Sequence, residues 1–115
     1  LNQNMAEYGE WNRKGATLSH VTAQKEYGVD RDFITKGIHT GKLEYCEGNV
    51  GGSPYLRILR RQLDEYIVEE LGHERLSRCK ELTELRNIKK EIAHLKRTLA
   101  VLQSRKAELE ESPEN

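Results

Sequence analysis

The sequence predicts a mainly α-helical fold with a small β-hairpin, organised as a compact head followed by one long C-terminal helix. Three observations support this: two short helical patterns around a Gly-Val-Asp turn, a glycine-rich stretch between two short strands, and an apolar heptad pattern near the C-terminus. A chain of 115 residues with 36 % hydrophobic content can bury one small core. We therefore expect a flexible arm over residues 1–16, a head over 17–71, a coiled-coil helix over 72–111 and a disordered tail over 112–115.

The predicted head begins with two short helices. Residues 22–27 fit one or two helical turns, and Gly28 tolerates the positive φ that a helix C-cap requires. Asp30 then suits the N-cap of the second helix. In that helix Ile34 and Ile38 stand at i and i+4 on one apolar face. The opposite face carries the polar set Arg31, Asp32, Thr35, Lys36 and His39.

A hairpin and a third helix complete the predicted head. Gly41 ends the second helix, and residues 42–45 and 54–58 are typical of short strands. The stretch between them, residues 47–53, contains three glycines and predicts the loop of a hairpin. A third helix then runs from about residue 60 and breaks near Gly72.

The chain carries Gly28-Val29-Asp30-Arg31 before the second helix, Gly41-Lys42-Leu43 after it, and Arg57-Ile58, Arg60 and Leu63-Asp64-Glu65-Tyr66-Ile67 at the end of the head. In these residues roughly half of the chain resembles the excisionase-like and MerR-like winged helix-turn-helix domains. The resemblance implies that the helix over residues 30–40 enters the DNA major groove and that the hairpin touches the neighbouring backbone or minor groove.

Three positions depart from that family's pattern. Gly37 replaces a bulky apolar residue, at a cost to the helix of about 1 kcal/mol relative to Ala. Asp32 places a carboxylate on the presumed DNA face, and Leu59 replaces a residue that is usually basic. The residues expected to contact DNA are Arg31, Asp32, Thr35, Lys36, His39, Lys42, Asn49, Arg57 and Arg60.

The charge balance of the head argues against strong DNA binding. Residues 1–71 hold nine Lys or Arg and eleven Asp or Glu, a balance of 9 − 11 = −2. Because DNA affinity depends on neutralising phosphates, such a head needs its cations gathered on one face. The leading interpretation is a dimeric or oligomeric DNA-binding protein, and ordinary solvated helix charges are the alternative interpretation of Arg31 and Lys36. The alternative function is therefore a protein-interaction adaptor whose winged head no longer binds DNA and whose coiled coil holds another protein.

The C-terminal third contains a heptad repeat. Its a and d positions are apolar except for Lys106 at one a position. A narrow apolar stripe on a charged helix suits a partner helix, so we expect self-association rather than a single helix folded back on its own head. The residues of the predicted seam are Leu85, Ile88, Ile92, Leu95, Leu99, Leu102 and Leu109.

The orientation of the predicted coiled coil is open. A parallel pair brings together three attractive charged pairs: Glu84 with Lys89, Glu91 with Lys96, and Arg105 with Glu110. A fully overlapping antiparallel pair brings together two, and exposed pairs contribute only ~0.3–0.5 kcal/mol each. The MerR-like resemblance favours the antiparallel arrangement, because that family dimerises through an antiparallel helix.

Other function classes find little support in the sequence. The histidines and the two cysteines, Cys46 and Cys79, lack the spacing of a metal site, and the glycine-rich stretch lacks the Lys-Ser/Thr end of a phosphate loop. We expect no enzyme, no metal and no cofactor. Because the two cysteines lie in different segments, far from a C-x-x-C spacing, we expect free thiols and a cytoplasmic protein. No apolar run approaches the ~20 residues of a membrane span. The sequence does not distinguish a transcriptional regulator from a mobile-element protein such as an excisionase or a small terminase subunit.

Overall fold

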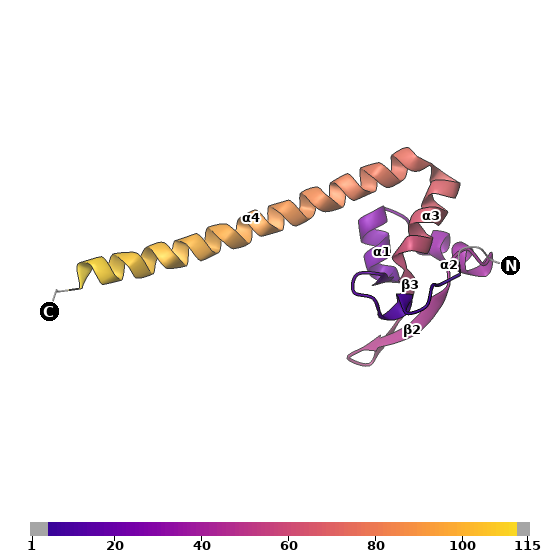
Figure 1. The fold of residues 1–115 in the computed structure, drawn as a ribbon, viewed down its shortest axis with the longest axis horizontal. Coiled ribbons are helices and arrows are strands. Elements are labelled where there is room, and N and C mark those ends of the chain that lie inside the picture. Colours follow the sequence, from indigo (N-terminus) through magenta and orange to yellow (C-terminus); the bar gives the residue numbers. More distant parts are fainter. Residues whose placement is uncertain (1–4, 113–115) are drawn as a thin grey trace. The chain divides into compact units, whose positions relative to one another are not determined.

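The computed structural model describes residues 5–112, whose elements are drawn in Figure 1. In chain order they are a 3-10 helix (Glu10–Asn12), β1 (Thr17–Ser19), α1 (His20–Tyr27), α2 (Arg31–His39), β2 (Tyr45–Val50), β3 (Ser53–Leu59), α3 (Arg60–Leu71) and α4 (His73–Glu111). The prediction of a mainly α-helical fold with a long C-terminal helix is confirmed, and in place of a lone β-hairpin there is a three-stranded antiparallel sheet. The tail predicted to be disordered lies, apart from Ser112, outside the described residues.

The chain divides into two compact units, Leu1–Glu81 and Leu82–Asn115. The first unit is wider than the predicted head of residues 17–71, because it also takes in the N-terminal segment and the first turns of α4. "The head" denotes this unit from here on.

Two helix caps, Gly28 and Asp30, define the turn between α1 and α2. Gly28 has φ +63° and donates its N–H to the Gln24 carbonyl oxygen over 3.0 Å. The Asp30 carboxylate accepts the Phe33 N–H over 2.8 Å, which confirms the predicted N-cap. At the start of α1 the Ser19 hydroxyl likewise accepts the Thr22 N–H over 3.0 Å. Each such cap contributes about 1 kcal/mol, so the positions of both helix starts follow from local sequence.

The sheet has three antiparallel strands in the order β1-β3-β2. Strand β1, which the sequence analysis did not predict, pairs Thr17 with Leu59 and Ser19 with Arg57. It is only three residues long, and one buried residue, Leu18, between two polar ones is too short a pattern to predict a strand. Its pairing depends on the neighbouring strand, which explains why local pattern missed it.

The hairpin is tighter than predicted. Strand β2 begins at Tyr45 rather than at residue 42, and Val50 pairs with Ser53, so the predicted loop over residues 47–53 is wrong. Only Gly51 and Gly52 lie between the paired strands, with φ of +57° and +87°. Positive φ at both central residues is what a two-residue hairpin turn of type I′ needs, because its twist matches that of the strands.

The core of the head is formed where α3 packs on the sheet and on α1 and α2. Its fully buried side chains include Ile34, Ile58, Leu63 and Ile67. Leu59, at the junction of β3 and α3, is also 0 % exposed, so the position that departs from the family pattern is occupied here by a core residue. Each such side chain contributes roughly 1.5–3 kcal/mol on burial.

Gly37 is a packing requirement in this fold. A Cβ built on Gly37 would lie 2.7 Å from Leu43 Cδ1 and 2.7 Å from Tyr66 Cε2. The Tyr66 ring is itself fixed, since it is buried and stacks on Phe33 with a centroid distance of 4.5 Å. Absence of a side chain at this position therefore lets α2 approach Leu43 and α3 closely.

We expect Gly37→Ala to destabilise the head although Ala is the better helix former. The added methyl overpacks the contact, which costs about 1–3 kcal/mol and exceeds the gain of up to ~1 kcal/mol in helix propensity. Urea unfolding measures the change. His39→Ala, an exposed position in the same helix, is the control and should shift stability by less than ~0.5 kcal/mol. A more stable Gly37→Ala protein would contradict the packing argument.

The N-terminal segment packs on the head, contrary to the expected flexible arm. Glu10 is 2 % exposed, and its Oε1 accepts from Arg61 Nη2 over 3.0 Å. Arg61 Nη2 also donates to the Met5 carbonyl oxygen, and the Trp11 ring lies under the Arg57 guanidinium at 5.9 Å. The partners are about fifty residues away in sequence, so no local pattern could have indicated this contact.

The Glu10–Arg61 contact makes packing of this segment depend on pH. The Arg61 hydrogen bond, opposed by desolvation, lowers the pKa of Glu10 below its ordinary 4.5. A carboxyl whose pKa is lowered on folding stabilises the folded state above its unfolded pKa, and the stabilisation is lost as pH falls through the folded pKa.

We expect wild-type protein to be about 1–3 kcal/mol more stable than Glu10→Gln at pH 7, with the difference shrinking as pH falls below the ordinary pKa of 4.5 and lost once pH falls through the lowered folded pKa. The fluorescence of Trp11, the single tryptophan, reports the transition. Glu7→Gln is the control, because Glu7 is 65 % exposed and lies 3.9 Å from Arg13. Identical pH profiles for Glu10→Gln and wild type would refute the role of this carboxyl.

Helix α3 ends at Gly72, at the predicted break, and α4 begins at His73. The first turns of α4 belong to the head: Leu76 packs on the core, and the buried Cys79 donates its S–H to the Tyr27 carbonyl oxygen over 3.2 Å. Lys80 adds an ion pair to Asp64 at 3.1 Å. Over residues 5–112, no helix is both long and apolar enough to span a membrane.

Candidate nucleic-acid interface

Helix α2 presents a polar face to solvent. Ile34 is 1 % exposed and Gly37 is buried, so these residues face the core. Arg31, Lys36 and His39 are exposed and make no ion pair or side-chain hydrogen bond within the described residues. Asp32 is exposed on the same helix, while Thr35 is half-buried. The predicted inward and outward sides of this helix therefore agree with the observed burial.

The other predicted DNA-binding cations are used within the head. Lys42 Nζ lies 2.9 Å from Glu69 Oε1, and this hydrogen bond raises the pKa of Lys42. Arg57 Nη2 donates to the Trp11 carbonyl oxygen over 3.0 Å and to Thr17 Oγ1 over 3.2 Å. These contacts connect the N-terminal segment and β1 to β3, so they hold the head together.

Arg60 is also engaged. Its Nη1 donates to Glu26 Oε2 over 2.8 Å and to the Tyr27 hydroxyl over 3.0 Å, while Tyr27 donates to Asp64 Oδ1. Burial, followed by the Asp64 hydrogen bond, raises the pKa of Tyr27. Because the guanidinium is only half-buried, part of it remains accessible at the start of α3. The sequence alone could not reveal these partners, since they come from α1.

Asn49 stands at the tip of the hairpin and is exposed. Its side-chain oxygen accepts the Gly52 N–H over 2.9 Å, which closes the turn. Cys46 and Glu47 lie on the same strand and are also exposed. The hairpin therefore offers one polar residue at its tip together with a carboxylate, and no unpaired cation among its own residues, 45–59.

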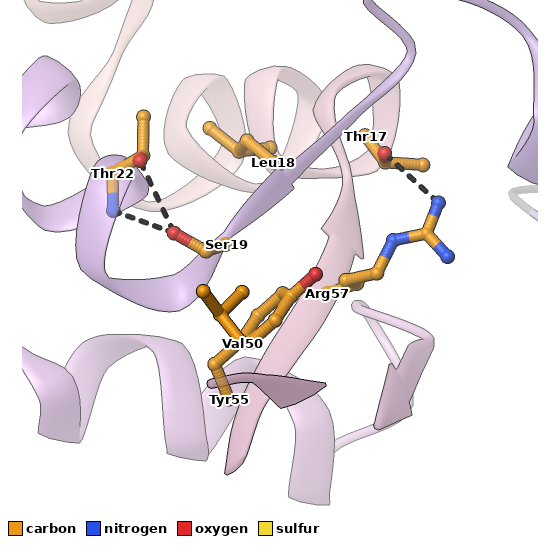
Figure 2. Close-up of a pocket in the computed structure, with 7 residues that line it drawn as sticks. All are labelled: Thr17, Leu18, Ser19, Thr22, Val50, Tyr55 and Arg57. Carbon is orange, nitrogen blue, oxygen red and sulfur yellow. Dashed lines mark hydrogen bonds between the residues drawn. The ribbon is translucent and has the colours of Figure 1, made fainter. Parts of the chain in front are cut away.

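An open pocket of about 420 Å³ lies between β1, the start of α1 and the hairpin (Figure 2). Its hydrogen-bonding groups are the hydroxyls of Ser19, Thr22 and Tyr55 and the Arg57–Thr17 pair. The Ser19 hydroxyl donates to Thr22 Oγ1 over 3.1 Å, so these two groups are already paired. Leu18 and Val50 supply the apolar part of the wall.

Sequence analysis missed this pocket. Its lining comes from residues 17–22 and 50–57, which only the β1–β3 pairing brings together. The one local signal was Ser19 as an N-cap three residues before Thr22. Hydroxyl and guanidinium donors in an open site are suited to oxygen acceptors of an anion such as a phosphodiester.

The C-terminal unit leaves its apolar stripe uncovered. All seven residues of the predicted seam are 47–61 % exposed. Lys106 occupies the expected a position between Leu102 and Leu109. A contiguous row of exposed leucine and isoleucine side chains marks a surface for association.

Residues 5–112 contain two free cysteines and no cluster of metal-ligating side chains. No group of three or more His, Cys, Asp or Glu side chains there is close enough to hold a metal ion. Cys46 is an exposed free thiol on β2, and Cys79 is a buried free thiol on α4.

No model of a known protein family matches this chain, and no curated protein or solved structure matches it either.

Proposed function

We propose that this protein is a DNA-binding protein that works as a dimer or higher oligomer, with the head as a winged helix-turn-helix. In this proposal α2 enters the major groove and the β2–β3 hairpin serves as the wing. The observation that carries it is the exposed, unpaired polar face of α2, with Arg31 and Lys36 opposite the buried Ile34. An α-helix of this kind fits the width of the major groove.

Residues outside α2 have supporting roles in the proposed contact with DNA. Asn49 lies on β2 and the accessible part of Arg60 lies at the start of α3, two elements that follow α2 in the chain. The pocket offers the hydroxyls of Thr22 and Tyr55 as donors for backbone phosphates rather than for base edges. Lys42 and Arg57 position the surrounding elements through Glu69 and Trp11, and they add less direct contact than the sequence analysis expected.

The exposed apolar stripe on α4 supplies the means of self-association. A second copy covering the row from Leu85 to Leu102 would bury side chains that are now about half exposed. Two linked heads recognise paired half-sites, which one small module with few base contacts does not do with useful specificity. Transcriptional regulation and recombination or DNA packaging are both compatible with such an arrangement.

A protein-interaction adaptor is the second candidate. It is favoured by the internal engagement of Lys42, Arg57 and Arg60, three of the cations expected to contact DNA. A titration of labelled random and genomic duplex fragments at about 50 and 200 mM salt separates the two functions. DNA binding requires measurable affinity at the lower concentration and a steep loss at the higher one. Absence of binding at about 50 mM salt would favour the adaptor.

A further inference from the structure

Basic residues gather along one side of α4, beside the apolar seam. Residues 85–106 hold seven Lys or Arg and one Asp or Glu, a balance of 7 − 1 = +6. This contrasts with the balance of −2 over residues 1–71. The strongest positive charge of the chain is therefore on the C-terminal helix and outside the proposed DNA-reading helix.

The arrangement of these cations follows the helix period. Five of them stand at i, i+3, i+4, i+10 and i+11, which places them on one face of an α-helix. The position at i+7 on this face is Ala93, and no carboxylate occurs on it between residues 86 and 104. We call this face the basic stripe; its cations are Arg86, Lys89, Lys90, Lys96 and Arg97.

The stripe is free for an external partner. All five side chains are exposed, and none makes an ion pair or hydrogen bond within the described residues. In the heptad frame Arg86, Lys90 and Arg97 occupy b and f positions, which stay outside in any two-stranded pairing through the seam. Lys89 and Lys96 occupy e positions and flank the seam.

We propose that the basic stripe binds the phosphate backbone of duplex DNA and supplies most of the protein's electrostatic attraction to it. The inference rests on the proposed function, because it adds a sequence-independent contact to the reading by α2. From Arg86 to Arg97 the stripe spans about 16 Å of helix axis. Phosphates recur about every 3.4 Å along each DNA strand, so a stripe of this length matches several of them.

This inference accounts for an otherwise contradictory charge distribution. Non-specific DNA affinity comes from the number of phosphates neutralised by Lys and Arg. The cations of residues 1–71 are outnumbered by carboxylates, whereas the stripe carries no carboxylate; its b and f positions contribute three cations per chain, and six in a dimer, that pairing through the seam leaves outside. Sequence preference and overall affinity are thus assigned to different elements of the chain.

The test compares two variants of the full chain that lose the same charge. Lys90→Gln/Arg97→Gln removes two cations from the stripe without touching the seam. Lys14→Gln/Lys25→Gln removes two exposed cations from the head. Binding of a labelled random duplex is titrated at several salt concentrations, and sedimentation equilibrium checks that both variants assemble like wild type.

We expect the stripe variant to lower the slope of log affinity against log salt by about two units for each chain bound, with a loss of affinity on the order of tenfold at 0.15 M salt. The control variant should keep the wild-type slope. Equal slopes for wild type and the stripe variant would overturn the inference while leaving the proposed function intact.

Two other results would also overturn the inference. If wild type fails to bind any duplex at about 50 mM salt, the proposed function fails, and the inference fails with it. Phosphatidylserine vesicles test whether the stripe binds lipid phosphate instead. Vesicle binding that Lys90→Gln/Arg97→Gln abolishes, with an unchanged DNA slope, would assign the stripe to a membrane surface and overturn the inference.

Discussion

Ile92→Asp should convert the assembled protein to monomers while the head stays folded. Ile92 lies at the centre of the exposed apolar row of α4 and is 47 % exposed in the single chain. In a paired seam the new carboxylate would be buried without a cation, at a cost of about 4 kcal/mol. That cost corresponds to roughly a thousandfold weaker association. Sedimentation equilibrium of both proteins over a range of concentrations measures the change.

Ser104→Asp is the matched control for this prediction. It introduces the same charge in the same helix but at an f position outside the seam, and Ser104 is exposed. We expect it to assemble like wild type. Urea unfolding followed by Trp11 fluorescence should give the same transition for the head in both variants, because Trp11 lies in the first compact unit. Wild-type protein that stays monomeric at tens of micromolar would refute self-association.

Arg31→Ala/Lys36→Ala should lose most of the sequence-dependent DNA binding. Both side chains are exposed on α2 and unpaired within the described residues, so truncation leaves the fold unchanged. A bidentate Arg contact to a guanine edge contributes ~1–3 kcal/mol of discrimination, and a Lys–phosphate contact adds about one unit to the salt slope. We expect a ten- to hundredfold lower affinity for a preferred sequence and a smaller change for random duplex.

The single variants separate the two contacts. Arg31→Ala should relax the sequence preference, whereas Lys36→Ala should weaken binding to all sequences alike. Lys25→Ala, an exposed cation on α1, serves as the control for loss of charge. Binding isotherms of the double variant that coincide with wild type at low salt would show that α2 does not contact DNA, and the adaptor would then be the better proposal.

Local sequence was sufficient for the helices of this protein. Gly28 and Asp30 specify the α1–α2 turn because a C-cap needs positive φ and an N-cap needs a side-chain acceptor. The i, i+4 spacing of Ile34 and Ile38 predicts which side of α2 is buried, and the heptad pattern predicts the apolar stripe of α4 that is exposed in the single chain. These features depend on residues within one or two turns of one another.

The pairing of the strands and the partners of the cations could be found only from the tertiary structure. Strand β1 forms only because β3 presents a partner edge, and the hairpin narrows to Gly51-Gly52 because its strands pair through Val50 and Ser53. By helix propensity alone, Gly37 destabilises α2. In the fold, Leu43 and Tyr66 pack so closely against Gly37 that a side chain has no room.

What the sequence by itself determined is the order of the helices, their caps and their apolar faces, because these follow from short-range periodicity and backbone geometry. Only the tertiary structure decided which cations are free. Lys42, Arg57 and Arg60 are positively charged like Lys36, but Glu69, Trp11 and Glu26 engage them across the fold. Charge pairing acts through space, so a cation's availability depends on partners that chain order does not reveal.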